Sequence, residues 1–225
     1  MLSCALPSWV EAATLFVSDG DVIHAYDAGT GAPTIADIPL QMVTGIAIGP
    51  HGDLFAASSN VAQIYRYDST SGLQIGSGPF VPYTGQNDGH DTPGPGGMAF
   101  APNGNLHIAD VTLSNVHEYD TAGNSVTSLT SPELAQPTDV AFDSNGNLYV
   151  ADTDFATVLK SIGGTQPFTE LFPPETGGLT IPTALTFGPD GKLYVLDSSN
   201  SGGPAIRRYT AAGVDDGTFI SYATI

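Results

Sequence analysis

Four segments of this chain repeat one pattern of short apolar runs separated by a turn. Each segment begins with an apolar run, passes through a turn that contains glycine, and ends with a second apolar run. The segments are Gly45–Ser58, Gly97–Asp110, Asp139–Asp152 and Ala184–Asp197, and a partial fifth copy begins at Leu15. A unit of this length must stack on its neighbours to bury its apolar faces. The repeat therefore constrains the fold more than any other feature.

The repeat unit has the composition of a small antiparallel sheet. The apolar run Val140–Phe142 is short enough for a strand buried on both faces. The turn at Asn145-Gly146 supplies the positive φ angles of a two-residue hairpin. A third strand follows, and then a more variable fourth, such as Thr218–Tyr222. No segment shows a sustained helical period. We therefore predict an all-β fold, a β-propeller of about five four-stranded blades, or six if the natural chain is longer.

The N-terminal blade is predicted to be incomplete, because Leu15 begins a second strand and no clear first strand precedes it. Residues 1–13 are interpreted either as the remnant of a secretion leader or as a degenerate strand over Leu6–Val10. Residues 14–225 then form a single propeller domain. A three-stranded blade and a longer natural chain are further explanations, and the sequence leaves all of them open.

Charge, cysteine content and hydropathy limit the classes of partner and the structural features that this chain can have. The chain has 23 acidic and 5 basic residues, which gives a formal net charge of −18. This charge argues against nucleic acid and anionic lipid as partners, because binding either depends on Lys and Arg. It suits a solvated acidic surface, a bound cation or a cationic partner. The single cysteine, Cys4, excludes an intrachain disulfide. No apolar stretch is long enough to predict a membrane span.

The repeat resembles the NHL repeat, most clearly over Pro137–Phe142 and Leu148–Asp152. The resemblance extends over residues 14–225, and the long Gly/Pro/Asp-rich inserts are similar to those of secreted bacterial members. It implies a secreted or periplasmic propeller. The wider group includes binding modules, lactonases and lyases, typically with six blades, so the resemblance indicates a fold rather than one function. It also includes calcium-dependent lactonases whose oxygen ligands lie at the mouth of the central channel.

In four of the five repeats an acidic residue stands where the second strand ends. The residues at this position are Asp19, Ser58, Asp110, Asp152 and Asp197. In one interpretation each carboxylate accepts hydrogen bonds from loop amides, as in an Asx turn. In the other, Asp110, Asp152 and Asp197 contribute to a ring of carboxylates that holds a metal, with Ca²⁺ as the cofactor.

Asp139 and one long insert are further candidates for a site. Asp139 stands where other copies have Gly or Ala, near the predicted central channel, and is a candidate metal or ligand contact. The insert over Phe80–Gly96 carries Asp88, His90 and Asp91, and it is longer than a connection between blades requires. We interpret these three residues as ligand-binding candidates or as part of a polar lid.

Three hypotheses about function are consistent with these features of the sequence. The leading hypothesis is a binding module that presents its rim loops to a protein, glycan or small-molecule ligand. The alternative is a divalent-cation-dependent hydrolase or lyase, similar to lactonases, with its site at the channel mouth. No nucleophile motif supports a catalytic residue. A third hypothesis is self-association through the incomplete blade.

Overall fold

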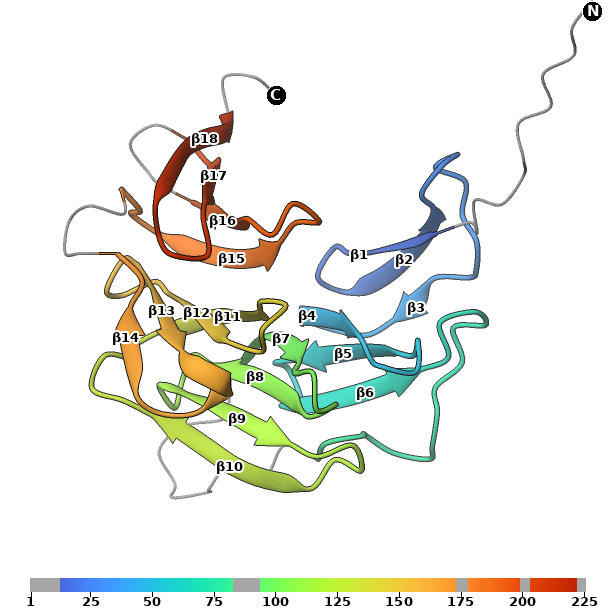
Figure 1. The fold of residues 1–225 in the computed structure, drawn as a ribbon. Helices are drawn as coiled ribbons and strands as arrows, with labels where there is room; N and C mark the ends of the chain where they lie inside the picture. The colour runs from blue at the N-terminus through green and yellow to red at the C-terminus, as the bar shows by residue number, and fades with distance from the viewer. Residues whose placement is uncertain (1–12, 83–93, 173–177, 199–202, 222–225) are drawn as a thin grey trace, which may run out of the picture.

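The computed structural model describes residues 13–82, 94–172, 178–198 and 203–221. Five antiparallel sheets follow one another in chain order around a central axis (Figure 1). The predicted five-bladed β-propeller is therefore confirmed. Among the described residues there is no α-helix, only a 3₁₀ turn (η1, Ile162–Gly164). Accordingly, no helix of the described ranges has the length and apolar character needed to cross a membrane.

The strands are assigned to blades by their hydrogen-bonded order. Blade 1 contains β1 (Thr14–Ser18), β2 (Val22–Asp27) and β3 (Ile38–Pro39), and blade 2 contains β4 (Val43–Ile48), β5 (Leu54–Ser58) and β6 (Gln63–Tyr67). Blade 3 contains β7 (Pro95–Phe100), β8 (Leu106–Asp110), β9 (Asn115–Tyr119) and β10 (Ser125–Thr130). Blade 4 contains β11 (Pro137–Phe142), β12 (Leu148–Asp152), β13 (Thr157–Ser161) and β14 (Phe168–Glu170). Blade 5 contains β15 (Pro182–Phe187), β16 (Leu193–Asp197), β17 (Ala205–Tyr209) and β18 (Asp215–Ser221).

In the described ranges the first two blades have three strands each. Blade 1 has no strand before β1 within the described residues, which begin at residue 13, so its predicted incompleteness stays a prediction. The segment Leu6–Val10 lies outside those residues. In blade 2 the prediction of a fourth strand is wrong, because only isolated bridges to Val81 and Gln74 take its place. Gly76, with a φ of 94°, and Pro79 both interrupt a regular ladder there.

The turns between the first and second strands differ from the expected two-residue form. In blade 4, the Asp143 N–H donates to the Asn147 carbonyl at 3.0 Å, so the turn has three central residues. Only the last of them, Gly146, has a positive φ, of 78°. This is the arrangement of a type I turn followed by a glycine bulge, for which a glycine in the left-handed region is sufficient.

The second strand of each middle blade forms the centre of the core. All five residues of β5, β8 and β12 are buried. Leu148 and Val150 of β12 pack in one cluster with Ala109 of the preceding blade. The alternate residues of the same strand, including Tyr149, pack in another cluster with the following blade. Each middle blade is therefore covered on both faces by its neighbours.

A recurring hydroxyl contact also joins successive blades. Thr44 and Thr138 lie at equivalent positions near the start of β4 and β11. Thr44 Oγ1 donates to the carbonyl of Pro95 at 2.5 Å, and Thr138 Oγ1 donates to that of Pro182 at 3.2 Å. Each contact links one inner strand to the proline that opens the inner strand of the next blade.

Within the part of the chain that the structure describes, the two end blades have no neighbouring blade on one face. In Figure 1 they lie at the top right and top left of the arrangement. In blade 1, Leu15 and Val17 are 53% and 42% exposed, whereas their equivalents in β12 are fully buried. In blade 5, Leu196 is 36% exposed on the face that would meet a following blade.

We expect the same substitution to have different effects at these equivalent positions. Val150→Ala should lower the free energy of unfolding by about 2 kcal/mol, because it removes buried methyl groups and leaves a cavity. Val17→Ala should lower it by less than about 0.5 kcal/mol, because Val17 is largely exposed. Urea denaturation of both variants measures the difference. Equal losses would show that the outer face of blade 1 is covered in solution.

Candidate functional site

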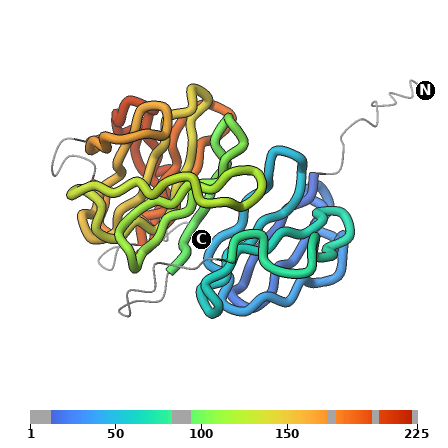
Figure 2. Tube along the Cα trace, turned by 90° about the horizontal axis from the view of Figure 1, so that it is seen from below, coloured from blue at the N-terminus to red at the C-terminus, as the bar shows by residue number. Residues whose placement is uncertain are grey.

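Each blade presents loops at two ends. The connection rim carries the loops between second and third strands together with the segments that join successive blades. The hairpin rim carries the turns between first and second strands. Figure 2 shows blades 1 and 2, coloured blue to teal, on one side and blades 3 to 5, coloured green to red, on the other. Asp110, Asp152 and Asp197, at the ends of β8, β12 and β16, lie at the connection rim.

Asp152 fastens two loops of the connection rim to each other. Its Oδ2 accepts hydrogen bonds from the backbone N–H groups of Ala135 at 2.8 Å and Gln136 at 3.0 Å, on the segment that enters blade 4. Its Oδ1 accepts one from the Phe155 N–H at 3.0 Å, in the loop between β12 and β13. The side chain is fully buried. One carboxylate therefore sets the relative position of both loops.

Asp110 also joins two loops, and Asp197 holds the segment that enters blade 5. Asp110 Oδ1 accepts from the N–H groups of Gly94, Thr112 and Leu113. Asp197 accepts from those of Thr180 and Ile181. These bonds confirm the loop-amide interpretation. In blade 2, Ser58 instead donates its Oγ–H to the Gln41 carbonyl at 2.6 Å.

The histidines on the neighbouring strand contact these aspartates in two blades. His24 Nε2 lies 3.3 Å from Asp19 Oδ2, and His117 Nε2 lies 3.5 Å from Asp110 Oδ2. The hydrogen bond to Asp37, assisted by the one to Asp19, raises the pKa of His24. Both histidines therefore help to position a strand-end carboxylate and the loop around it.

A repeated apolar residue lies beside these aspartates on the connection rim. Val61, Leu113 and Phe155 occupy the same position of the loop in blades 2, 3 and 4. Val61 is 47% exposed and Phe155 is 51% exposed, while Leu113 is half-buried. None of these residues is among the predicted site residues, although they align with one another three residues after the strand-end position of Asp152.

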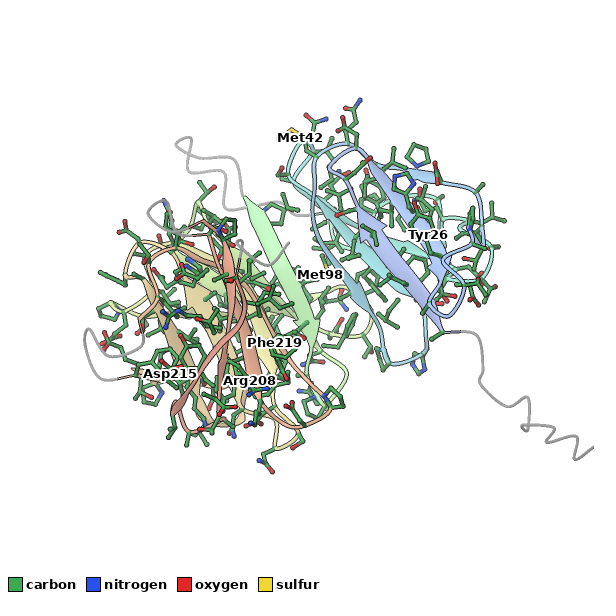
Figure 3. All side chains as sticks on the ribbon, turned by 90° about the horizontal axis from the view of Figure 1, so that it is seen from above. Tyr26, Met42, Met98, Arg208, Asp215 and Phe219 are labelled. Atoms are coloured by element: carbon green, nitrogen blue, oxygen red, sulfur yellow. The ribbon has the colours of Figure 1, made fainter. Side chains whose placement is uncertain are left out.

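The residue after each apolar side chain has an unusual backbone. Ala62, Ser114 and Ala156 have φ angles of 49°, 52° and 52°, a left-handed conformation that non-glycine residues seldom adopt. Met42, at the entry to blade 2, has a φ of 50° and is 54% exposed (Figure 3). The rim therefore keeps the same strained loop in three blades, with an apolar side chain ahead of the strain.

Asp139 lies between the inner strands of three blades. Its Oδ2 accepts a hydrogen bond from the Leu185 N–H of β15 at 2.8 Å, and its Oδ1 accepts one from the Val140 N–H at 2.8 Å. A Cβ atom built on Gly97 of β7 would lie only 1.7 Å from Asp139 Oδ1. Asp139 therefore occupies the space that the missing side chain of Gly97 leaves, and connects blades 3, 4 and 5.

The environment of Asp139 favours its neutral form. Desolvation by the surrounding protein raises its pKa to about 7, and the two backbone donors only partly oppose this effect. A carboxyl group with such a pKa exchanges its proton near neutral pH, which is the property required of a general acid or base.

The predicted metal ligands do not form a group. Among the described residues, no three His, Cys, Asp or Glu side chains are placed so that they could hold a metal ion. The oxygens of Asp110, Asp152, Asp197 and Asp139 instead accept backbone hydrogen bonds. Ca²⁺ binds six to eight oxygen ligands, and these separately placed carboxylates, whose oxygens accept backbone hydrogen bonds, do not provide such a set. Asp88, His90 and Asp91 lie outside the described residues, so their role stays a prediction.

Solved structures share this fold at low sequence identity. Virginiamycin B lyase from Staphylococcus aureus superimposes with a TM-score of 0.68 at 15% identity, over 90% of this chain and 65% of the lyase. This chain thus spans slightly less than two thirds of that lyase. A chain of the nidogen/laminin complex gives a TM-score of 0.71 at 17% identity, over 88% of this chain and 73% of its own length. A gluconolactonase from Xanthomonas campestris gives 0.65 at 15% identity, over 96% and 78%.

Family comparison adds evidence from the sequence itself. No curated protein matches the chain significantly. The family model described as the SMP-30/gluconolactonase/LRE-like region matches residues 11–154, which is more than half of the chain and extends from the start of blade 1 to the end of β12. This chain therefore belongs to the SMP-30/gluconolactonase/LRE-like family of β-propellers.

Proposed function

We propose that this chain is a binding module that contacts a protein partner through its connection rim. The observation that carries the proposal is the repeated loop with Val61, Leu113 and Phe155 at one position. Two of these apolar side chains are about half exposed, and buried aspartates hold their loops in place in blades 3 and 4. Pre-ordered loops lose little conformational entropy on binding, which favours affinity.

The charge of the rim indicates the character of the partner. Asp21, Glu133 and Asp154 are exposed on the same rim, and the chain as a whole carries a net charge of −18. A partner with a basic surface around an apolar centre would match this arrangement. The nidogen/laminin complex supports the proposal only as a propeller of the same fold that is found in a protein complex. A secreted or periplasmic location remains part of the proposal.

Site-specific photocrosslinking tests this function. We expect a photoreactive phenylalanine at position 155 to give one predominant adduct in extracts of the source organism. The adduct should decrease at least about tenfold when Val61 and Leu113 are both replaced by Ser, because interface energy concentrates in a few apolar contacts. The matched control carries the same group at Ile162, which is 70% exposed near the hairpin rim. Equal adducts from both positions would contradict the proposal.

A second candidate function rests on Asp139. A carboxyl group with a pKa of about 7 suits acid–base chemistry on a lactone or an ester, and the lactonase and lyase neighbours share the fold. The raised pKa is the specific observation in its favour. The hydrogen bonds that occupy both carboxyl oxygens favour a structural role instead. Replacement of this one side chain separates the two roles.

A further inference from the structure

A cavity of about 300 Å³ lies between blades 2 and 3 at the hairpin rim, opposite the connection rim. Its lining includes Phe55, Phe80, Phe100, Arg66, Asp53 and Thr121. We call it the aromatic slot. Its volume is at the lower end of the range for small-molecule sites, which combine apolar walls with a few polar groups.

Three phenylalanine rings form the apolar wall of the slot. The rings of Phe55 and Phe80 meet edge to face with centroids 5.0 Å apart, and those of Phe55 and Phe100 meet at 4.9 Å. Phe55 is almost fully buried. These rings come from three separate parts of the chain, so their relative positions are fixed by the packing of blade 2 on blade 3. Such a wall suits a flat ring.

Arg66 supplies the polar group. Its Nε donates to Asp53 Oδ2 at 2.8 Å, and its Nη2 donates to the same oxygen. Nη1 has no partner among the described residues. The guanidinium carbon lies 5.6 Å from the centre of the Phe55 ring. Arg66 is also one of only five basic residues in the chain. Its remaining N–H groups are available to a ligand acceptor.

The equivalent position between blades 4 and 5 shows why the slot is open. Phe55 pairs with Arg66 across the sheet in the register in which Tyr149 pairs with Lys160. There the Tyr149 hydroxyl donates to the Ala211 carbonyl at 2.9 Å, and Lys160 Nζ donates to the same carbonyl at 3.1 Å. The chain thus fills that position with its own side chains. In the slot, Phe55 lacks the hydroxyl, and Asp53 holds Arg66.

We propose that the aromatic slot binds a small planar aromatic carboxylate. The ring would lie against the phenylalanine wall, and the carboxylate would accept hydrogen bonds from Arg66, which forms planar paired contacts with carboxylates. This site is independent of the connection rim and of Asp139.

Titration with benzoate, followed by amide NMR spectra at about 0.15 M salt, tests the site. This salt concentration screens the negative charge of the protein beyond about 8 Å. We expect saturable shifts at Asp53, Gly104 and Thr121, with a Kd near 1 mM, as is usual for a ligand of this size. Benzamide, which is planar but uncharged, and cyclohexanecarboxylate, which is charged but not planar, should each bind at least about tenfold more weakly.

Three variants make the test specific. Arg66→Met should weaken benzoate binding at least about tenfold. Phe55→Tyr should block the slot, because it restores the hydroxyl found at the equivalent Tyr149. Arg208→Met is the matched control, because Arg208 pairs with Tyr194 in the same register of blade 5 and should leave binding unchanged. Equal losses in the two arginine variants, equal binding of benzamide, or no saturable shifts at the slot would overturn the proposal.

Discussion

Asp152→Ala should lower the free energy of unfolding by about 4 kcal/mol, a larger loss than most single substitutions cause. The substitution leaves the backbone N–H groups of Ala135, Gln136 and Phe155 without their acceptor. Each buried donor left without a partner costs about 1 to 3 kcal/mol, and water at the rim recovers part of this. Urea denaturation at pH 7 measures the change.

Two further variants separate this role from a general effect of charge. Asp152→Asn keeps one acceptor oxygen and should lose only about half as much stability. Asp154→Ala, two residues away, removes an exposed carboxylate and should change stability by less than about 0.5 kcal/mol. A loss below about 1 kcal/mol for Asp152→Ala would show that other contacts hold the two loops together.

The effect should extend to the rim. The Phe155 N–H is one of the three groups that Asp152 holds, and the next residue, Ala156, has a strained left-handed backbone. When the carboxylate is removed, that strain is no longer balanced by the hydrogen bond. Amide exchange over residues 153–157 should therefore become faster in Asp152→Ala under conditions where the variant is still folded.

Much of the fold follows from local patterns in the sequence. The run Leu148–Asp152 predicts a buried second strand, and the structure buries all five residues. The loop-amide interpretation of Asp152 was also accessible, because an Asx-type contact depends mainly on nearby backbone. Both features repeat in several blades, so each copy supports the same inference.

The remaining features depend on contacts between distant segments. Asp139 receives a hydrogen bond from Leu185 in the next blade, and its side chain fills space over Gly97 in the preceding one. The aromatic slot likewise combines Phe55, Phe80 and Phe100 across two blades. No local pattern specifies such packing. Gly76 and Pro79 are local evidence against a fourth strand in blade 2. The repeat pattern nevertheless predicts that strand, because the other blades have one.

The stability of this protein should increase as the pH falls from about 7.5 to 5, and Asp139 should account for most of the increase. Its pKa is raised from 3.8 to about 7 in the folded protein, so the folded state takes up a proton in a range where the unfolded chain does not. Linkage then requires this contribution to be complete below about pH 4 and lost as the pH rises through 7. Between pH 7.5 and 5 it amounts to about 2 kcal/mol.

The comparison with Asp139→Asn isolates this contribution. Asparagine does not titrate, so only the wild type gains stability from protonation at this position. The unfolding free energy of the wild type minus that of the variant should therefore increase by about 2 kcal/mol as the pH falls over the same range. His24, whose pKa is raised, and His107, whose pKa burial lowers, titrate in both proteins and cancel in the difference. A difference that does not change with pH would contradict the raised pKa of Asp139.

The same variant decides between a structural and a catalytic carboxyl. If Asp139 is a general acid or base, the wild-type protein should hydrolyse lactones or esters with a pH midpoint near 7, and Asp139→Asn should lose at least about a hundredfold in rate. If Asp139 only joins blades 3, 4 and 5, neither protein should turn over these substrates, while the pH dependence of stability still differs between them. The stability measurement thus tests the protonation of Asp139 independently of any substrate, and the kinetic measurement tests whether its proton reaches one.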